Sequence, residues 1–306
     1  MSNYMSKVCV LLAAYNGEKY IGEQVESILS QQGVDVDIYI RLDPSTDNSM
    51  EIIEKISKLN RNVHLLPVFF PSGGAGQNFL RLLLEVDISD YDYIAFSDQD
   101  DIWFSKKLLR AIDCLNSNNV DAYSGNVIAW WENGKQKLVN KSSPQRSYDY
   151  LFESAGPGCT FVFNKDLATE LKFFLQSLDE RIKNIWLHDW FFYAFARSRN
   201  FKWFIDAKPM MKYRQHDSNS VGANSGVTAF KMRVREVLSG EAFSKTLSQA
   251  EVLGLNYQQP IKFLLKKDFI SEMRLVFLAN QCRRKPVDKI LFTFAILVYA
   301  FKRKLK

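Results

Sequence analysis

Residues 93–103 read YIAFSDQDDIW: a continuous apolar run, then three carboxylates within four residues, then Ile and Trp. The apolar run, residues 93–97, predicts a strand that is buried on both faces of a parallel sheet. Because ligands of an open parallel sheet bind beyond the carboxyl ends of its strands, Asp98, Asp100 and Asp101 are expected at a binding site. On an extended segment Asp98 and Asp100 would point the same way, and two like charges so close are costly unless a proton or a cation relieves their repulsion.

The acids have two interpretations at this point. Carboxylate oxygens are the ligands that Mg²⁺ and Mn²⁺ prefer, and these ions commonly bind a substrate phosphate as well. Alternatively, the acids form a solvated turn that caps a helix beginning near Ser105. A calcium loop of the EF-hand type is not expected, because no glycine and no closing glutamate stand at the required positions.

The first 120 residues alternate apolar runs with helical patterns, which predicts an α/β fold with a doubly wound sheet. Strands are expected at 8–14, 37–42, 63–68 and 93–97, and helices at 21–29, 52–59, 77–85 and 105–115. The next hundred residues lack this regular alternation. They predict strands near 122–131 and 159–163 and helices at 166–175 and 188–197.

Polar clusters follow three of the expected strands. Tyr15-Asn16-Gly17 follows the first strand, LDPSTDNS (residues 42–49) the second, and SDQDD the fourth. If these strands are neighbours in the sheet, the three clusters converge on one crevice.

The charge and the cysteines narrow the class of protein. Residues 257–306 hold 12 of the 40 Lys and Arg residues but 3 of the 34 Asp and Glu residues, so the rest of the chain is slightly acidic. A nucleic-acid-binding protein would more usually spread its basic charge over the folded face, and we expect no nucleic-acid partner. The four cysteines are widely scattered, without the spacing of a zinc site or a disulfide framework, which fits a reducing compartment. No apolar stretch reaches the roughly 18 residues of a spanning helix.

Six stretches, taken in order, resemble family 2 of the nucleotide-sugar glycosyltransferases, and within it the bacterial branch with rhamnosyltransferases of surface-polysaccharide assembly. They cover about residues 7–222 and read YNGEKYIGEQVESILSQQ, LDPSTDNS, SDQDDIW, GPGCTFVF, LHDWFFYAFA and YRQHDSNSVG. The resemblance implies a GT-A (Rossmann-like) nucleotide-sugar-binding domain with a mixed central sheet over residues 1–226. Its nucleotide-binding half would be 1–120 and its acceptor half 121–226. The QxxRW signature of processive synthases is absent, which favours transfer of one sugar per acceptor.

The resemblance also implies roles on the donor side. Asp98 would hold the ribose or the metal, Asp100 would bind the divalent cation directly, and His216 would be a third metal ligand. Asp43 would read the uracil or thymine edge, although this chain has Leu42-Asp43-Pro44 where relatives often have two acids and a glycine. The other residues expected to bind the nucleotide-sugar are Ala14, Tyr15, Asn16, Asn78, Gln99 and Arg214.

On the acceptor side the resemblance implies that Asp189 is the catalytic base of an inverting transfer. Many relatives have an acid before this aspartate, whereas this chain has His188. Gly158, Cys159, His188 and Trp190 are expected to shape the acceptor side. Without the resemblance, Asp189 would read as an acid favoured by a helix N-terminus.

The C-terminal segment 227–306 is predicted to be a basic, helical, membrane-associating tail. Residues 290–301 read ILFTFAILVYAF between basic flanks, which is too short to span a bilayer and too apolar for an ordinary surface helix. An interfacial anchor drawn to anionic lipid is expected. The alternative is a helix buried against the body or in a dimer interface.

The resulting expectation is an inverting glycosyltransferase that depends on Mn²⁺ or Mg²⁺. It would move rhamnose or another hexose from a UDP- or dTDP-sugar to a saccharide or polyprenyl-linked acceptor. It would work in the cytoplasm, peripheral on the inner face of the cell membrane. A metal-dependent phosphoryl or nucleotidyl transferase at the same acids, or a calcium-dependent peripheral membrane protein, are the alternatives.

Overall fold

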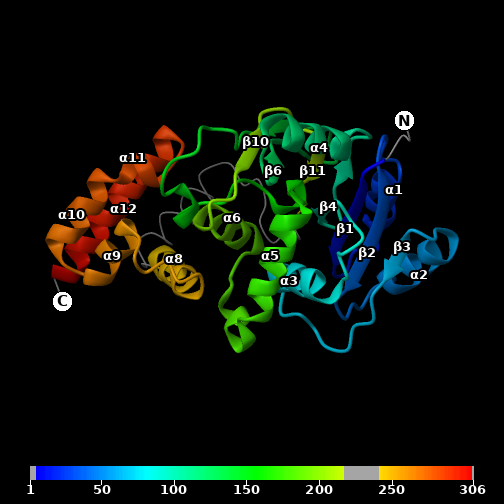
Figure 1. Ribbon diagram of the computed structural model, residues 1–306, viewed down its shortest axis with the longest axis horizontal. Coiled ribbons are helices and arrows are strands. Elements are labelled where there is room, and N and C mark those ends of the chain that lie inside the picture. The colour runs from blue at the N-terminus through cyan, green and yellow to red at the C-terminus, as the bar shows by residue number, and fades with distance from the viewer. Residues whose placement is uncertain (1–4, 217–240, 305–306) are drawn as a thin grey trace.

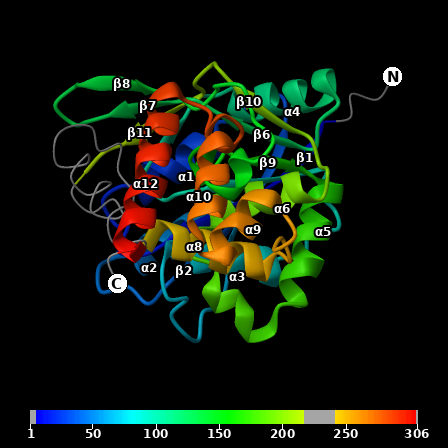
Figure 2. The ribbon, with the colours of Figure 1, turned by 90° about the vertical axis from the view of Figure 1, so that its left-hand side faces the viewer.

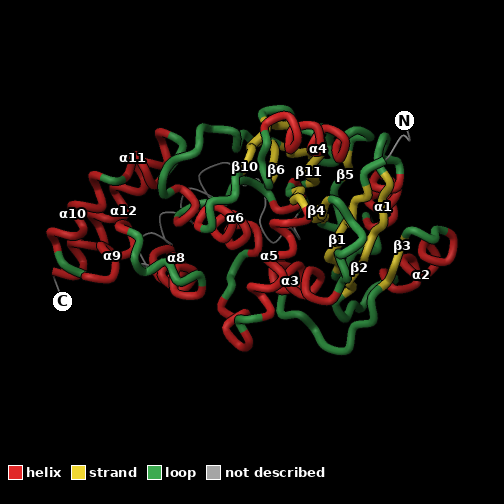
Figure 3. Tube along the Cα trace, in the orientation of Figure 1, coloured by secondary structure: helices red, strands yellow, loops and turns green. Residues whose placement is uncertain are grey.

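The computed structural model describes residues 5–216 and 241–304. In these residues the main sheet has seven strands in the order β10-β6-β9-β4-β1-β2-β3 (Figures 1 and 3). Its strands are β1 (Lys7–Ala14), β2 (Asp35–Leu42), β3 (Val63–Leu65), β4 (Tyr93–Ser97), β6 (Ala122–Gly125), β9 (Val162–Asn164) and β10 (Trp203–Asp206). β9 runs antiparallel to β4 and β6, so the sheet is mixed, as the resemblance implied.

The strand β1 lies between β2 and β4 in this sheet. It pairs in parallel with β2 on one side and with β4 on the other, so that Leu12 is in register with both Ile40 and Ser97. The carboxyl ends of these three strands therefore meet at one edge of the sheet. This arrangement confirms the expected neighbourhood of the strands that precede the three polar clusters.

Alternate residues of β1 enter two different hydrophobic cores, as the period of two of a strand requires. Val8, Val10 and Leu12 pack with α1 (Ile21–Leu29), α2 (Ser49–Leu59) and α4 (Lys107–Asn118). Cys9, Leu11 and Ala13 pack with α3 (Ala75–Glu85), α5 (Lys165–Gln176) and α6 (His188–Ser198). The sheet is thus covered on both faces.

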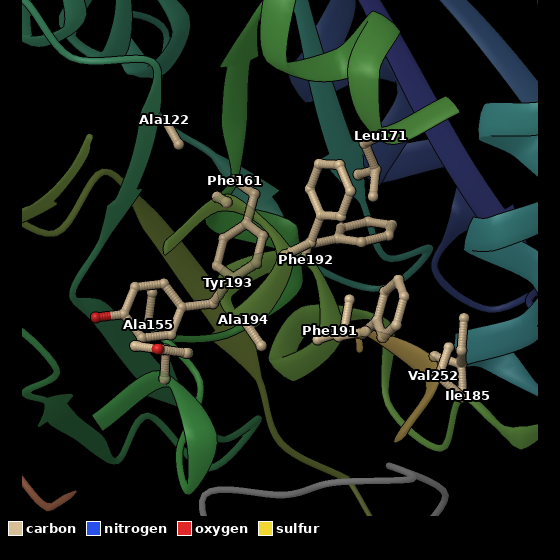
Figure 4. Close-up of a cluster of buried hydrophobic side chains, with 14 of the residues drawn as sticks. Ala122, Ala155, Phe161, Leu171, Ile185, Phe191, Phe192, Tyr193, Ala194 and Val252 are labelled. Atoms are coloured by element: carbon tan, nitrogen blue, oxygen red, sulfur yellow. The ribbon is translucent and has the colours of Figure 1, made fainter. Parts of the chain in front are cut away.

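Helix α6 is an unusually aromatic element of the second core. Phe191, Phe192, Tyr193 and Phe195 are all buried, and Figure 4 shows the first three among side chains from several other elements. Such large buried rings fix the position and rotation of the helix. The first residues of the helix, His188 and Asp189, are consequently held in a fixed position.

Two strand predictions in the second hundred residues are wrong in detail. Residues 122–131 form two strands, because the chain turns at Asn126, whose side chain accepts hydrogen bonds from the backbone N–H groups of Lys141 and Ser142. Residues 158–160 form a helical turn, and the strand β9 begins only at Val162. The hydrophobic pattern within an isolated apolar run gives no sign of either break.

A smaller sheet covers the acids that follow β4. In the described residues it has the order β5-β11-β7-β8, with β5 (Ile102–Trp103), β7 (Val127–Trp130), β8 (Gln136–Val139) and β11 (Met211–Arg214). The short strand β5 follows the acids directly and pairs antiparallel with β11. This pairing brings Arg214 beside the acids, although more than a hundred residues separate them in the sequence.

The C-terminal helices gather at one end of the molecule, on the left in Figure 1 and facing the viewer in Figure 2. They are α8 (Glu241–Val252), α9 (Gln259–Lys266), α10 (Phe269–Phe277), α11 (Ala279–Cys282) and α12 (Pro286–Lys304). Phe243, Leu264 and Phe292 join the core that contains α6. The predicted domain boundary at 226/227 lies outside the described residues. None of the described helices has the length and apolar character needed to cross a membrane.

Candidate active site

The loops after β1 and β2 are clamped together by their own side chains. The Asn16 side chain accepts a hydrogen bond from the Thr46 backbone N–H at 2.9 Å, and the Asn16 N–H donates to the Ser45 hydroxyl at 3.0 Å. The Gly17 N–H donates to the Ser49 hydroxyl at 2.7 Å. Asn16 has a φ of 45°, a conformation that asparagine tolerates better than most residues.

A reciprocal pair ties the first of these loops to the acids. The Tyr15 N–H donates to Oε1 of Gln99, and Nε2 of Gln99 donates to the Tyr15 carbonyl, both at 2.8 Å. The phenol ring of Tyr15 stays more than half exposed at the edge of the sheet. The three polar clusters therefore converge, as predicted.

Asp43 belongs to a buried polar network at the carboxyl end of β2. Its carboxylate accepts from Nη1 of Arg41 at 2.6 Å and from the Ser72 backbone N–H at 3.2 Å. Nη1 of Arg41 also donates to Oδ1 of Asn78 at 3.2 Å, and the Asn78 amide donates to the Arg41 carbonyl at 3.1 Å. Asp43 and Asn78 thus lie together, and the Ser72 contact brings the segment PSGGAG, residues 71–76, against Asp43.

Arg41 is a site residue that the sequence analysis missed. It lies near the carboxyl end of β2, two positions before Asp43, which follows the strand, and its Nη1 reaches the Asp43 carboxylate. A second carboxylate, Glu85, lies 3.3 Å from its Nε. A basic residue at this spacing from a candidate aspartate was the available signal.

The acids after β4 do not continue as an extended segment, which corrects that expectation. The chain bends at Gln99 and Asp100, and Asp98 is grouped with the buried residues Asp101 and Cys159. The ligand atoms of Asp98, Asp101 and Cys159 all lie within 4.8 Å of one another. Burial, and next the charge of Asp100, raise the pKa of Asp98 to about 7. The same two causes raise the pKa of Asp101 well above its usual range.

Asp100 faces a different partner. Nε2 of His216 lies 2.8 Å from Oδ2 of Asp100, and the His216 ring stacks on Tyr20 with centroids 5.0 Å apart. These two residues are thus adjacent, as a shared metal site would require. The rest of the stretch that follows His216, residues 217–222, lies outside the described residues.

Arg214 holds the bend in place. Its backbone N–H donates to the Asp101 carboxylate at 3.0 Å and its Nε donates to the Asp100 carbonyl at 2.8 Å. The guanidinium is sandwiched at 4.5 Å from the rings of both Tyr20 and Trp130. Arg214 therefore fixes the position of the acids, besides the role in diphosphate binding that was expected for it.

Beneath the acids lies a buried lysine that the sequence analysis did not single out. Nζ of Lys107 lies 3.4 Å from the Trp103 ring centroid, and burial lowers the pKa of Lys107 to about 7. Among the described residues, Nζ of Lys107 and Oδ2 of Asp101 are both buried without a hydrogen-bond partner. A carboxylate oxygen left in this state, beside two further ligand atoms, suits a cation better than a solvated turn.

Asp189 occupies the first turn of α6. Its carboxylate accepts from the Trp190 backbone N–H at 2.6 Å, as an acid at a helix N-terminus commonly does. Burial raises the pKa of Asp189 to about 6, while Lys141 opposes that shift. Asp189 lies close enough to Asp98 for its charge to raise the pKa of Asp98.

His188 is packed among apolar rings. Its imidazole lies 4.1 Å from the Phe79 ring and 5.6 Å from the Phe192 ring, and burial lowers its pKa to about 3. A Cβ on Gly158 would lie 2.1 Å from Nε2 of His188, so the glycine makes room for the ring. Trp190 is buried, and its Nε1 donates to the Tyr150 carbonyl at 2.9 Å.

Comparison with known proteins gives this geometry a family. Residues 9–183, more than half of the chain, match the family described as glycosyl transferase family 2. This chain belongs to glycosyl transferase family 2. The dTDP-rhamnosyl transferase RfbG of Shigella flexneri is 42% identical over 291 residues, which span 95% of this chain and 100% of that protein. Membership of this glycosyltransferase family sets aside the phosphoryl-transfer and calcium-dependent alternatives.

Solved structures of low sequence identity share the fold with this family 2 chain. S. aureus TarS 1-349 in complex with UDP aligns with a TM-score of 0.57 at 17% identity, covering 98% of this chain and 92% of that one. The mannosyltransferase PcManGT from Pyrobaculum calidifontis, in complex with GDP-Man and Mn²⁺, aligns with a TM-score of 0.50 at 14% identity, covering 98% and 88%. The fold is therefore of the GT-A type, as the resemblance implied.

Proposed function

We propose that this enzyme transfers one L-rhamnose from dTDP-rhamnose to a saccharide acceptor in bacterial surface-polysaccharide synthesis, with inversion at the anomeric carbon. The proposal rests on one observation. The chain is 42% identical to a dTDP-rhamnosyl transferase over nearly its whole length, and its Asp189 lies close enough to the acids after β4 to shift the pKa of Asp98, which supports a shared site. UDP as the nucleotide and another hexose as the sugar are the alternatives that a donor panel would separate.

The donor nucleotide would lie over the loops after β1 and β2. Asp43 would accept from the base, and its orientation is fixed by Arg41 and Ser72. Ala14, Tyr15 and Asn16 would line the base and ribose pocket. Arg41 is only 3% exposed and compensates the charge of Asp43, while the Ser72 contacts occupy acceptor sites that the base would take over.

A divalent cation, Mn²⁺ or Mg²⁺, fits the acids after β4. Asp100 and His216 are adjacent, and Asp98 and Asp101, on both of which the charge of Asp100 acts, would supply further oxygens. When bound, the cation would neutralise charge that develops on the leaving diphosphate. PcManGT carries Mn²⁺ in its complex with GDP-Man, which is consistent with this assignment.

Asp189 would act as the general base. Its carboxylate would take the proton from the acceptor hydroxyl as that oxygen bonds to the anomeric carbon and the bond to the diphosphate breaks. A pKa of about 6 keeps the carboxylate ionised at neutral pH and basic enough to accept the proton. Gly158, Cys159, His188 and Trp190 would form or support the wall against which the acceptor lies.

The substitution Asp189→Asn tests this assignment, because it keeps the hydrogen bond to the Trp190 N–H and removes the base. We expect the transfer rate, measured as dTDP released in the presence of a lipid-linked oligosaccharide fraction, to fall about 10²- to 10⁴-fold. Binding of dTDP-rhamnose should persist, which shows that the donor site is intact. An Asp189→Asn enzyme with near wild-type turnover would exclude Asp189 as the base.

We also propose that the C-terminal helices dock on an anionic membrane surface that carries a polyprenyl-linked acceptor. Helix α12 buries Phe292, Ala295 and Ile296 against its neighbours, yet Ile290 is 70% exposed. The exposed apolar side chains on α10 and α12 also include Ile270, Phe277, Val287, Phe294 and Phe301. Basic side chains lie among them in the sequence, and each contributes about 1 kcal/mol near an anionic surface. The enzyme would then act peripherally on the cytoplasmic face.

A further inference from the structure

A cavity of about 650 Å³ lies far from the acids, where the body meets the C-terminal helices. Its walls come from residues 145–150, the end of α6, the segment leading into β10, and the turn between α8 and α9. Strand β10 is parallel to β6, and β9 is antiparallel to both β6 and β4. Strand β10 therefore runs in the same direction as β4. The cavity lies at the amino end of β10, and the acids follow the carboxyl end of β4. The two sites are therefore at opposite edges of the sheet.

The described side chains that line this cavity are aromatic rings, uncharged polar groups and the two cations Arg197 and Lys202. Rings come from Tyr148, Tyr150, Phe201, Trp203 and Tyr257. Amide groups come from Gln145, Asn200 and Gln258, and two serines add hydroxyls. Of the residues that the structure describes, neither an aliphatic side chain nor a carboxylate lines it. A site for an apolar ligand would instead be lined mostly by hydrophobic side chains.

The walls are held in place by hydrogen bonds that do not involve a ligand. Nε2 of Gln145 donates to the Trp203 carbonyl at 2.5 Å, and Nε1 of Trp203 donates to the Ser124 hydroxyl at 2.9 Å. Nη1 of Arg197 donates to Oε1 of Gln145 at 2.6 Å. A cavity whose walls are fixed in advance spends less of its binding free energy on ordering.

The charge in the cavity favours an uncharged ligand. The Arg197 guanidinium lies 3.3 Å from the buried Asp149 carboxylate and donates to the Tyr193 hydroxyl at 2.6 Å. Its charge is thus compensated inside the protein. Of the two lining cations, Lys202 remains, at the exposed rim. A phosphate or nucleotide site usually assembles more positive charge than this one side chain.

We infer that this cavity is a second saccharide-binding site, separate from the crevice of the transfer reaction. A sugar ring has C–H faces that stack on aromatic rings, and hydroxyls that both donate to and accept from amides and hydroxyls. The inference rests on the proposed function, because a growing glycan offers sugars beyond the one that receives the transfer. Holding the glycan at a second point raises its effective concentration at the crevice. Tyr257 and Gln258 also make the site dependent on the C-terminal helices.

The test is saturation-transfer NMR of L-rhamnose, D-glucose and N-acetyl-D-glucosamine with the full chain, in the absence of nucleotide. Two variants alter the cavity: Tyr257→Ala removes a ring that is 58% exposed, and Asn200→Gly removes an amide where φ is 66°, so glycine keeps the backbone. Phe173→Ala, an exposed ring on α5, is the matched control. We expect one of the sugars to bind the wild-type and Phe173→Ala proteins and to bind both cavity variants on the order of tenfold more weakly.

The outcomes separate this inference from the proposed function. A sugar signal that both cavity variants retain would place the sugar elsewhere and overturn the inference. So would the lack of any sugar signal in a wild-type protein that dTDP-rhamnose with Mn²⁺ still protects against thermal unfolding. Loss of that donor protection would count against the proposed function, whatever the sugars do.

Discussion

Two carboxyl groups of the crevice have pKa values that fall near neutrality. Burial raises the pKa of Asp189 to about 6, and burial with the charge of Asp100 raises that of Asp98 to about 7. Both must be ionised for the proposed reaction, one to accept a proton and the other to help hold a cation. His188 has a pKa lowered to about 3 and stays neutral over the same range.

The transfer rate of the cation-loaded enzyme is therefore expected to rise with pH through about 6, the pKa of Asp189, and to level off above it. The sign follows from the raised pKa, because the carboxyl group loses its proton as the pH rises and only the charged form is active. The measurement is kcat/KM for the acceptor at saturating donor, from acid to mildly alkaline pH. A rate that falls as pH rises through 6 would contradict the roles given to these acids.

Gly158 and His188 form a steric pair that can be tested directly. A Cβ at Gly158 would lie 2.1 Å from Nε2 of His188, whose ring is confined by Phe79 and Phe192. We expect Gly158→Ala to cost about 1–3 kcal/mol of unfolding free energy by overpacking. His188→Ala in the same chain should recover most of that loss, so the double-mutant cycle would show strong coupling. Simple additivity of the two changes would show that the pair is not in contact.

At the scale of elements, the C-terminal helices are joined to the body by a buried ion-pair network. Nε of Arg284 lies 3.6 Å from Asp149 and its Nη2 lies 3.4 Å from Glu153, while Nη2 also donates to the Ser154 carbonyl. Asp149 in turn accepts from Tyr193 on α6 at 3.0 Å. The network therefore reaches the helix that carries Asp189 at its first turn.

Breaking this network should be costly. Arg284→Met leaves two carboxylates short of compensation in a buried place, and we expect a loss of about 3–5 kcal/mol in urea unfolding. Arg284→Lys keeps the charge and should lose less, although it lacks the fork that reaches several acceptors. Arg274→Met, on the exposed side of α10, is the control and should change stability by about 0.5 kcal/mol or less. Equal effects of the two Met variants would refute the network's role.

The elements that periodicity predicts best are those whose burial follows one regular pattern, continuous in the strands and periodic in the helices. The strands β1 and β4 and the helices α1, α3, α5 and α6 lie within a few residues of their predicted ranges. The break between β6 and β7 was missed because it depends on the Asn126 side chain and its distant partners Lys141 and Ser142. A contact between segments far apart in the chain leaves no local pattern to read.

The candidate site follows the same rule. Its loop residues could be predicted because they follow strands that proved to be neighbours. The grouping of Asp98 with Asp101 and Cys159, and the roles of Arg41, Lys107 and Lys141, depend on bends and on packing from other segments. These bends and this packing are not encoded within a short stretch of sequence.

At the scale of the molecule, two regions differ in surface character. The proposed donor site is polar and acidic, whereas α10 and α12 expose apolar side chains. Helices α10 and α12 lie side by side at the end of the molecule shown in Figure 2, and Phe277 on α10 is 83% exposed. Monomeric proteins rarely leave several large apolar side chains exposed together unless they meet a partner or a membrane.

Docking on lipid predicts selective binding to acidic vesicles. The wild-type protein should sediment with phosphatidylglycerol vesicles and much less with phosphatidylcholine vesicles. Phe277→Asp combined with Ile290→Asp should weaken the binding at least tenfold, since each change removes an apolar contact and adds a repelled charge. Phe173→Asp on α5, a similarly exposed ring, should leave it intact. Equal sedimentation of all three proteins would reject the proposed surface.

The central claim is that the crevice at the ends of β1, β2 and β4 binds a nucleotide-sugar together with a divalent cation. Thermal unfolding of the full chain with dTDP-rhamnose, with and without Mn²⁺, tests it most directly, because a ligand that binds only the folded state raises the Tm. We predict a rise in Tm that needs both ligand and cation and is lost in Asp100→Ala. An unchanged Tm with dTDP- and UDP-sugars alike, or a rise that Asp100→Ala retains in full, would contradict the account.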